Sequence, residues 1–481
     1  MAPRRYMSMM TYRPSTAHAD LGPDFYDVVA PAAFPQHILR FRNQRWAEAV
    51  GLGGLSDAEW IAHFGRFEPL PDNLPQPLAL RYHGHQFRSY NPDLGDGRGF
   101  LAAQLLDDEG RLLDLGTKGS GQTPYSRSGD GRLTLKGGVR EVLASSLLEA
   151  FGVYTSKTFS LIETGEALMR GDEPSPTRSS VMVRLSHSHV RFGTFQRCLA
   201  HNDAAGITAL VAHCIRHYHP QAARGGDVAK EAPALLAAVS QATGALAGEW
   251  MAAGFVHGVL NTDNMVVTGE SFDYGPWRFL PRYEPGFTAA YFDQTGLYAF
   301  GRQPGAVAWN LERFAECLTL VAPVADLEDA LRTYAGAFHE GLRRALCARL
   351  GLRQVDADTD DELAAAFFQF LLKSQAPFER TMFDWHGGLA RRAFAMAGPQ
   401  AQYYQGQDFA RLEAALGAHE PVPPAPGAAA YFDGEGPATL LIEEVEALWA
   451  PIAERDDWSL FTAKLDQIER AREAHAITPR R

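Results

Sequence analysis

The chain changes character near residue 203, and this change limits the folds open to it. Before that point, glycine-rich turns alternate with short apolar runs such as Phe100–Leu106, Arg111–Leu115 and Ser180–Leu185, which are typical of strands and hairpins. A single helix is predicted over Arg140–Phe151, because apolar residues recur there at helical spacing and Gly152 ends the run. A strand-rich part followed by a helical part predicts an α+β fold rather than alternating βαβ units.

The rest of the chain divides by composition. Residues 1–80 are rich in proline and aromatics, and we expect an irregular N-terminal extension that packs on the main body. We expect one domain over 81–202, a helical one over 203–400, and a C-terminal region over 401–481 that contains a linker at 422–427 and a helical tail at about 436–475. Five segments between 203 and 400 predict helices: Ala205–Tyr218, Ala232–Ala253, Asn310–Val321, Asp326–Leu350 and Asp360–Leu372.

Charge and composition exclude some classes of protein. The 481 residues hold 45 Lys plus Arg and 57 Asp plus Glu, a net charge of −12, which argues against a dedicated nucleic-acid binder but allows a local basic groove. No apolar run is long enough to cross a membrane, and no apolar segment follows the charged N-terminus as in a secretory signal. We therefore expect a cytoplasmic monomer that contacts neither membranes nor nucleic acid.

The cysteines and histidines offer few metal ligands at recognisable spacing. The four cysteines form no C-x-x-C pair, so we interpret them as structural thiols in a reducing compartment: Cys198, Cys214, Cys317 and Cys347. Two His-x-His pairs, His83 with His85 and His187 with His189, could each place two rings on one side of a strand. Neither pair has a further ligand nearby in sequence, so core histidines are the favoured interpretation.

Two glycine-rich turns could bring backbone amides close to phosphate oxygens. The first contains Gly95, Gly97 and Arg98, and the arginine could add a positive charge. The second contains Asp130 and Gly131. The alternative for the first turn is an ordinary hairpin turn, which it would be if it stood alone.

A lysine and a glutamate occur at positions that suit nucleotide binding. Residues 116–123 nearly match a P-loop, but Gln122 stands where the phosphate-binding lysine belongs. Lys118 ends a predicted strand, and Glu141 follows in the first turn of the predicted helix. Kinases use such a pair to hold a lysine against phosphates. The alternative is an exposed lysine and a glutamate favoured by the helix dipole.

Two arginines flank a predicted loop. Arg184 and Arg191 lie seven residues apart, on either side of the sequence Ser-His-Ser-His. Arginine side chains bind phosphate with two parallel hydrogen bonds, so the pair could hold a triphosphate. Surface arginines are common, and the pair carries little weight without the other motifs.

The most informative motif lies between 257 and 275. Asn264 comes seven residues after His257, and Asp273 begins the sequence Asp-Tyr-Gly, as in the metal-binding half of a kinase site. The usual base position holds Val259, which cannot accept a proton, and Asp263 is the nearest substitute. The alternative is a turn rich in Asn and Asp. The kinase-like order of Lys118, Glu141, Asn264 and Asp273 argues against that alternative.

Together these segments resemble the selenoprotein O family of kinase-like protein adenylyltransferases. The similarity spans about 82 to 311 and rests on the stretches Tyr82–Phe87, Leu94–Arg98, Lys118 with Gly119, Thr123–Arg127, Gly129–Arg132, Arg140 with Glu141, Val190–Gly193, His257–Val259, Asn261–Met265, Phe272–Pro276, Gln303 with Pro304, and Trp309–Leu311. It departs from the family at the C-terminus, where the family often has a redox-active Cys or selenocysteine and this chain has none after Cys347.

The resemblance implies a fold and a reaction. The fold would be two-lobed and kinase-like, with a β-rich N-lobe over 81–202 that binds nucleotide and a helical C-lobe. ATP would bind in a reversed orientation, so that AMP passes to a Ser, Thr or Tyr hydroxyl of a protein and pyrophosphate leaves. A conventional phosphotransferase and an inactive nucleotide-binding pseudokinase scaffold are the alternatives.

The resemblance also implies roles for individual residues. Asp263 would be the base, Glu141 would support Lys118, and Asn264 and Asp273 would hold Mg²⁺ or Mn²⁺, with Asp273 also near the nucleotide. The remaining nucleotide-binding residues would be Gly95, Gly97, Arg98, Lys118, Asp130, Gly131, Arg184 and Arg191.

Overall fold

The computed structural model describes residues 11–171, 173–478 and 480. The charged N-terminal residues considered for a secretory signal lie outside the described residues. The chain separates into two compact units, the first made of Met1–Val142, Ser156–Leu235 and Val266–Thr268, and the second of Leu143–Thr155, Leu236–Met265 and Gly269–Arg481. Among the described residues, no helix combines the length and apolar character needed to cross a membrane.

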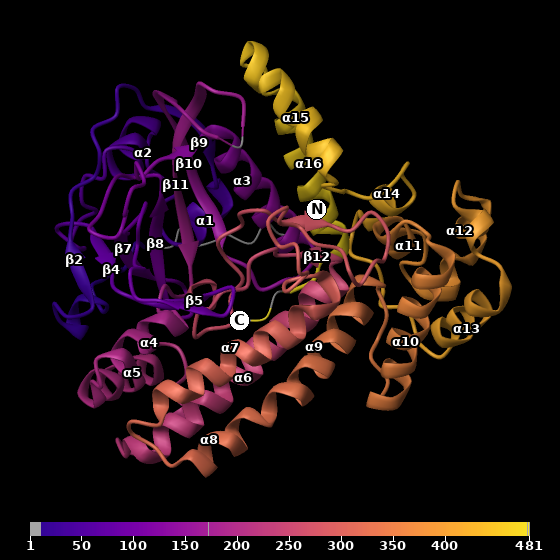
Figure 1. The fold of residues 1–481 in the computed structure, drawn as a ribbon. Helices are drawn as coiled ribbons and strands as arrows, with labels where there is room; N and C mark the ends of the chain where they lie inside the picture. Colours follow the sequence, from indigo (N-terminus) through magenta and orange to yellow (C-terminus); the bar gives the residue numbers. More distant parts are fainter. Residues whose placement is uncertain (1–10, 172, 479, 481) are drawn as a thin grey trace. The chain divides into compact units, whose positions relative to one another are not determined.

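The first unit is built on an antiparallel sheet (Figure 1). Its strands follow the order β2-β4-β7-β8-β11-β10-β3, while β1 pairs with β7 and β9 pairs with β11. The strands are β1 Pro14–Ser15, β2 Tyr26–Val28, β3 Ile38–Arg42, β4 Leu78–Leu80, β7 Leu101–Leu106, β8 Leu112–Lys118, β9 Leu133–Thr134, β10 Lys157–Leu168 and β11 Thr177–Ser186. The predicted α+β class is confirmed, and so are the strands expected at 100–106, 111–115 and 180–185.

The two faces of the central strands differ in chemistry. Side chains alternate between faces along β8 and β11, and most of the apolar side chains of each strand lie on one side. That set packs with the helix α2 Asp57–Phe64 into one core, which contains Trp60, Phe64, Leu113, Leu115, Val181, Val183 and Leu185. The opposite face carries the charged members Asp114, Lys118 and Arg184. The core on one face therefore fixes which side chains the other face presents.

The sequence predicted an irregular N-terminal extension, but the structure shows regular elements there. Its strands β1 to β4 belong to the sheet, and two helices, α1 Gln44–Ala49 and α2, lie between them. Asn43 caps α1 by accepting from the Trp46 amide, and Ser56 and Glu59 form a capping box at α2. The proline-rich composition made these short elements hard to predict. Trp60 of α2 is fully buried, which anchors that helix in the core.

The helix that carries Glu141 begins earlier than predicted. It is α3, Leu135–Ala150, so Glu141 lies in its second turn rather than its first. The sequence suggested a later start because Gly137 and Gly138 disfavour helix. A Cβ at Gly138 would lie 2.4 Å from the Leu161 side chain, so close packing on β10 requires this glycine. The alternative in which the helix dipole favours a glutamate in the first turn therefore does not account for the presence of Glu141.

The remaining elements are mostly helical, and the segments predicted as helices are confirmed, except that 326–350 is divided into α8 and α9. The first unit adds α4 Phe192–Ala200 and α5 Ala204–His217, and a separate hairpin joins β5 Gly84–Gln86 to β6 Ser89–Asn91. The other elements are α6 Val228–Ala252, β12 Phe255–Val256, β13 Arg278–Phe279, α7 Gln303–Leu318, α8 Val324–Leu331, α9 Thr333–Arg349, α10 Ala357–Ser374, α11 Phe378–Asp384, α12 Arg392–Ala397, α13 Gly406–Gly417, α14 Ala428–Phe432, α15 Ile442–Arg455 and α16 Ser459–His475. The last two confirm the predicted helical tail.

Buried histidines make the first unit sensitive to acid. His18 and His213 are 2% and 7% exposed, and their ring centroids lie 6.1 Å apart. Burial lowers the pKa of His18 to about 4 and that of His213 to about 3. Both rings are therefore neutral in the folded chain. Their contribution to stability is complete above the unfolded value of about 6.5 and is lost progressively as the pH falls below it.

We expect His213→Phe to reduce this acid sensitivity. At about pH 5 the unfolded wild-type chain gains a proton that buried His213 cannot hold, which costs about 2 kcal/mol of unfolding free energy relative to about pH 7.5. Urea unfolding at both pH values measures the difference. Burial raises the pKa of Glu379 to about 7, so this group makes the folded chain more stable as the pH falls, opposite to the histidines. The variant must therefore be compared with the wild type at each pH, not with a calculated pH dependence. An equal pH dependence in both chains would contradict the assignment.

Candidate active site

Lys118 and Glu141 form a buried ion pair in the first unit. Lys118 is the last residue of β8 and is 5% exposed, and Glu141 on α3 is 3% exposed. The lysine Nζ donates to Glu141 Oε1. Because each charge is removed from water, the pair holds the lysine in one orientation, and an exposed lysine and glutamate are excluded. The sequence prediction that Glu141 supports Lys118 matches this contact.

Arg184 lies on the same face of the sheet as Lys118. Met182 of β11 pairs with Lys118, and Arg184, two residues further along, pairs with Gly116. Cross-strand partners and residues two apart share a face, so the arginine and the lysine are diagonal neighbours. Arg184 is 5% exposed. The register of β8 and β11 thus brings together two cations that are 66 residues apart in the chain.

A histidine and an aspartate occupy the same face beyond Gly116. Asp114 Oδ2 accepts from the backbone amide of His189 at 2.8 Å and lies 3.2 Å from its Nδ1. A Cβ at Gly116 would lie 2.3 Å from His189 Nε2, so glycine is required there for the ring to fit. His189 therefore acts as a packing and hydrogen-bonding residue that fixes the loop between Arg184 and Arg191.

Arg191 is held by an aspartate that the sequence analysis did not assign. Its Nη1 donates to Asp96 Oδ1 at 2.8 Å, and its guanidinium lies over the Tyr82 ring at 4.2 Å from the centroid. Asp96 Oδ2 in turn accepts from the Leu80 amide at 3.1 Å. Asp96 lies inside the glycine-rich turn, and its position between Gly95 and Gly97 was the only signal available. The contact joins Arg191 to that turn.

The glycines of the first turn are required by close packing. A Cβ at Gly95 would lie 2.3 Å from the Tyr125 ring, and one at Gly97 would lie 2.9 Å from the Tyr125 carbonyl oxygen. Arg98 is exposed, and its carbonyl oxygen accepts from the amide of Gly119 at 2.6 Å. The turn therefore lies directly beside the end of β8, next to Lys118.

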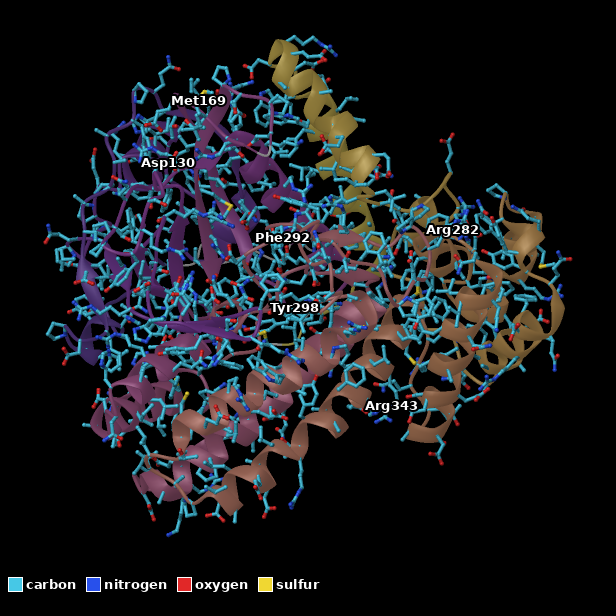
Figure 2. All side chains as sticks on the ribbon, viewed as in Figure 1. Asp130, Met169, Arg282, Phe292, Tyr298 and Arg343 are labelled. Atoms are coloured by element: carbon cyan, nitrogen blue, oxygen red, sulfur yellow. The ribbon has the colours of Figure 1, made fainter. Side chains whose placement is uncertain are left out.

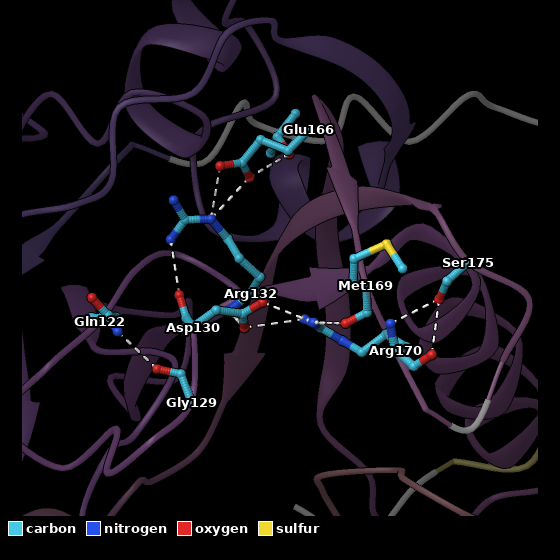
Figure 3. A network of polar contacts seen from close by, with 9 residues as sticks. Gln122, Gly129, Asp130, Arg132, Glu166, Met169, Arg170 and Ser175 are labelled. Atoms are coloured by element: carbon cyan, nitrogen blue, oxygen red, sulfur yellow. Dashed lines mark hydrogen bonds and ion pairs between the residues drawn. The ribbon is translucent and has the colours of Figure 1, made fainter.

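The second turn forms a polar network of its own (Figure 3). Asp130 accepts from Arg170 Nη1 at 2.8 Å and Nη2 at 3.1 Å, and from the Arg132 amide at 3.0 Å. Burial by itself raises the pKa of Asp130, but the hydrogen bonds from Arg170 and Arg132 outweigh it and lower the pKa below its usual value. Gly131 has a φ of 69°, and a Cβ there would lie 2.3 Å from the Gly121 carbonyl carbon. Asp130 is thus an ionised, exposed carboxylate, already engaged by arginine.

The second unit holds Asp263 and Asn264 on a short 3-10 turn, Thr262–Asn264. Asn264 Nδ2 donates to the Val259 carbonyl at 2.9 Å. The loop is tied on both sides, because Tyr298, which is labelled in Figure 2, donates to Asn261 Oδ1 at 2.8 Å, and Asn310 donates to the Leu260 carbonyl at 2.9 Å. Both Asp263 and Asn264 are half-buried. The loop is therefore held in one conformation while the two side chains remain accessible.

Asp273 directly follows Phe272, which is hydrogen-bonded to His257 at the start of the loop that carries Asp263. His257 Nε2 contacts the Phe272 carbonyl oxygen at 2.9 Å, and the Tyr274 hydroxyl is hydrogen-bonded to Thr155. Asp273 has a φ of 64°, a conformation that non-glycine residues rarely adopt. The neighbouring contacts hold the residue there, and such strain is typical of functional sites.

These two residues have the donor atoms that a magnesium ion prefers. The amide nitrogen of Asn264 faces Val259, so its Oδ1 faces away from that contact, and Asp273 supplies a half-buried carboxylate. Mg²⁺ binds through one or two such oxygen ligands together with substrate phosphates and water. The residues present therefore fit the ion that the resemblance implies.

The His-x-His pairs are engaged in other contacts. His83 Nδ1 lies 2.6 Å from the Tyr90 hydroxyl, and His85 Nδ1 lies 2.6 Å from Gln196 Nε2. Burial lowers the pKa of His187 to about 3. In the part of the chain that the structure describes, the one group of three potential metal ligands contains neither pair.

Comparison with known proteins decides the family. A sequence model described as Protein adenylyltransferase SelO matches residues 7–396, and Protein nucleotidyltransferase YdiU of Gloeobacter violaceus is 44% identical over 482 residues, covering 97% of this chain and 96% of its own length. The chain belongs to the SelO family. The YdiU protein of Synechocystis is 42% identical and covers 96% of this chain, and that of Vibrio cholerae is 36% identical and covers 76%.

Membership of the SelO family confirms the resemblance inferred from the motifs and the class of enzyme, a protein nucleotidyltransferase. Sequence reasoning had no role for Asp96, Gln303 or Asn310, although all three lie in stretches that carried the resemblance. Gln303 accepts from the His257 amide at 2.9 Å and donates to the Phe255 carbonyl at 2.8 Å. Gln303 and Asn310 thus position the loop that carries Asp263, and Asp96 positions Arg191, contacts that only the folded chain reveals.

Proposed function

We propose that this chain transfers AMP from ATP to a Ser, Thr or Tyr hydroxyl of a protein. The hydroxyl oxygen attacks the α-phosphorus, the bond to the bridging oxygen of the β-phosphate breaks, and pyrophosphate leaves. The observation that carries the proposal is the buried Lys118–Glu141 pair, found in a chain that belongs to a family described as protein adenylyltransferases. The architecture we propose is two-lobed and kinase-like, with ATP bound in the reversed orientation.

In this proposal the cations of the first unit bind the polyphosphate. Lys118 and Arg184 share one face of the sheet, and Arg191 is oriented by Asp96. Arginine forks and a fixed lysine stabilise the negative charge that develops on the departing pyrophosphate. Gly95, Gly97 and Arg98 would approach the phosphates from the adjoining turn, and Asp130 and Gly131 would contact the nucleotide from the second turn. Asp130 can orient a donor group but cannot attract phosphate by charge.

The residues of the second unit would supply the metal ligands and the base. Asn264 and Asp273 would hold Mg²⁺ or Mn²⁺, and the ion would neutralise phosphate charge when bound. Asp263 would accept the proton of the attacking hydroxyl. Val259, at the usual kinase base position, contributes only its carbonyl oxygen to Asn264. Most of the rate enhancement would come from positioning and from stabilisation of charge.

The test is to incubate the purified chain and a mixture of proteins with ATP labelled at either the α- or the γ-phosphate. We expect protein-bound label from α-labelled ATP alone, with pyrophosphate as the second product. Label from γ-labelled ATP alone would show an ordinary phosphotransferase and overturn the proposal. Nucleotide binding without transfer of either label would show an inactive scaffold.

A further inference from the structure

Three potential metal ligands meet in the second unit, away from the proposed active-site residues. Cys347 lies on α9, Asp360 lies on α10, and His419 follows α13 by two residues. Their ligand atoms all lie within 4.8 Å of one another. All three residues are buried, at 2%, 2% and 6% exposure, inside an apolar core that includes Leu350, Leu363 and Leu416. Polar groups buried this deeply must find partners.

The contacts of His419 fix which nitrogen carries its proton. Nδ1 lies 2.9 Å from the Ala415 carbonyl oxygen, which can only accept, so Nδ1 must be the donor. Nε2 lies 3.0 Å from Asp360 Oδ1. In a neutral ring this nitrogen has a lone pair, which would face the lone pairs of the carboxylate. A proton or a metal ion is therefore required between Nε2 and Oδ1, and the proton could be carried by either the ring or the carboxyl group.

The surroundings of Asp360 resemble the second shell of a metal site. The Val355 amide donates to Oδ1 at 3.0 Å, and Gln354 Nε2 donates to Oδ2 at 3.2 Å. Ligating carboxylates are commonly hydrogen-bonded in this way, and ligating histidines donate their other N–H to a backbone carbonyl, as His419 does. The group thus has both ligands and the contacts that orient them.

The position of Cys347 favours the metal ion over the proton. A proton between His419 and Asp360 makes no use of the sulfur atom. A metal ion would take sulfur, nitrogen and oxygen together, the donor set that zinc accepts. Burial and the nearby carboxylates raise the pKa of Cys347 to about 12, so the metal-free residue is a thiol. On binding, its S–H bond breaks, the electron pair remains on sulfur to form the metal bond, and the proton leaves to solvent.

A cavity reaches the group at Cys347. It has a volume of about 470 Å³, lies wholly in the second unit, and is lined by Cys347 and Gln354 among others. Three protein ligands leave one tetrahedral position of a zinc ion open, as in sites that exchange a water or bind a small molecule. On the side of Cys347, the cavity would offer an entry path and space for that fourth ligand.

We propose that Cys347, Asp360 and His419 bind one zinc ion whose fourth position faces this cavity. The site joins α9, α10 and the end of α13 and is independent of the magnesium ligands Asn264 and Asp273. Sequence spacing does not reveal it, because the three ligands are 13 and 59 residues apart and follow no known pattern. Zinc held by these three residues would also stabilise the fold by the free energy of binding.

The first test measures metal in the full chain, expressed without a histidine tag, loaded with ZnCl₂ and dialysed. We expect about one zinc ion per chain by elemental mass spectrometry. Cys347→Ala and His419→Gln should lose the ion, while Cys214→Ala, which removes another buried thiol, should retain it. Gln354→Leu should weaken zinc binding by about 10- to 100-fold. A wild-type chain that holds no zinc would overturn the proposal and leave a proton between His419 and Asp360.

The second test uses Co²⁺ as a spectroscopic probe on the folded wild-type chain. Thiolate ligation should produce a sulfur-to-cobalt charge-transfer band in the near ultraviolet, and added Zn²⁺ should remove it. The Asn264→Ala, Asp273→Ala double variant should show the same band, because those residues lie outside the site. A wild-type cobalt complex without this band would also overturn the proposal, since it would exclude Cys347 as a ligand.

Discussion

We expect Lys118→Met to lower the rate of AMP transfer by about 100- to 1,000-fold. This is the range seen when one group that stabilises transition-state charge is removed. Methionine keeps the length and much of the volume of the lysine but cannot bind phosphate. The measurement is kcat/KM with α-labelled ATP. Lys230→Met, which changes an exposed lysine of the first unit, should leave the rate unchanged.

The same substitution should also destabilise the fold, and the two effects can be separated. Without the lysine, the buried Glu141 carboxylate loses the opposite charge that Lys118 supplies, at a cost of about 3–5 kcal/mol. Lys118→Met combined with Glu141→Gln removes that charge, so the double variant should regain much of the lost stability in urea unfolding. It should not regain activity. A stable double variant that transfers AMP at the wild-type rate would show that Lys118 does not act on the nucleotide.

Asp263→Asn should abolish most of the transfer while nucleotide binding persists. Asparagine keeps the shape of the side chain and cannot accept the hydroxyl proton, and loss of a general base costs about 100- to 10,000-fold in rate. The dissociation constant for ATP, measured by calorimetry, should change by no more than a few-fold, because the polyphosphate ligands proposed lie in the first unit. This combination distinguishes a base from a nucleotide ligand.

The control for this variant is Asp326→Asn, which removes an exposed carboxylate from the first turn of α8. It should retain full activity and the same affinity for ATP. If Asp263→Asn remains fully active under the conditions in which Asp326→Asn does, the assignment of the base is wrong. If Asp263→Asn instead loses ATP binding, the residue contributes to the nucleotide site and not to proton transfer.

The family and the main elements could be predicted from local patterns, because those patterns are short in sequence. Glycine turns, strand alternation and helical spacing each involve a few neighbouring residues, and they located β7, β8, β11 and the long helices. The two failures have different causes. The start of α3 was misplaced because helix propensity penalises Gly137 and Gly138, whereas packing against Leu161 favours the second of them. The N-terminal strands were missed because each is only two to five residues long.

The order of the charged residues along the chain was sufficient to indicate nucleotide chemistry. It could not show that Lys118 and Arg184 share a face, which follows from the antiparallel register of β8 and β11. It could not show that Asp96 holds Arg191, or that Cys347 meets Asp360 and His419, because those contacts join residues 95 and up to 72 positions apart. Residue types and their order are properties of the chain, whereas burial, register and long-range pairing arise only when separate segments exclude water from the same core.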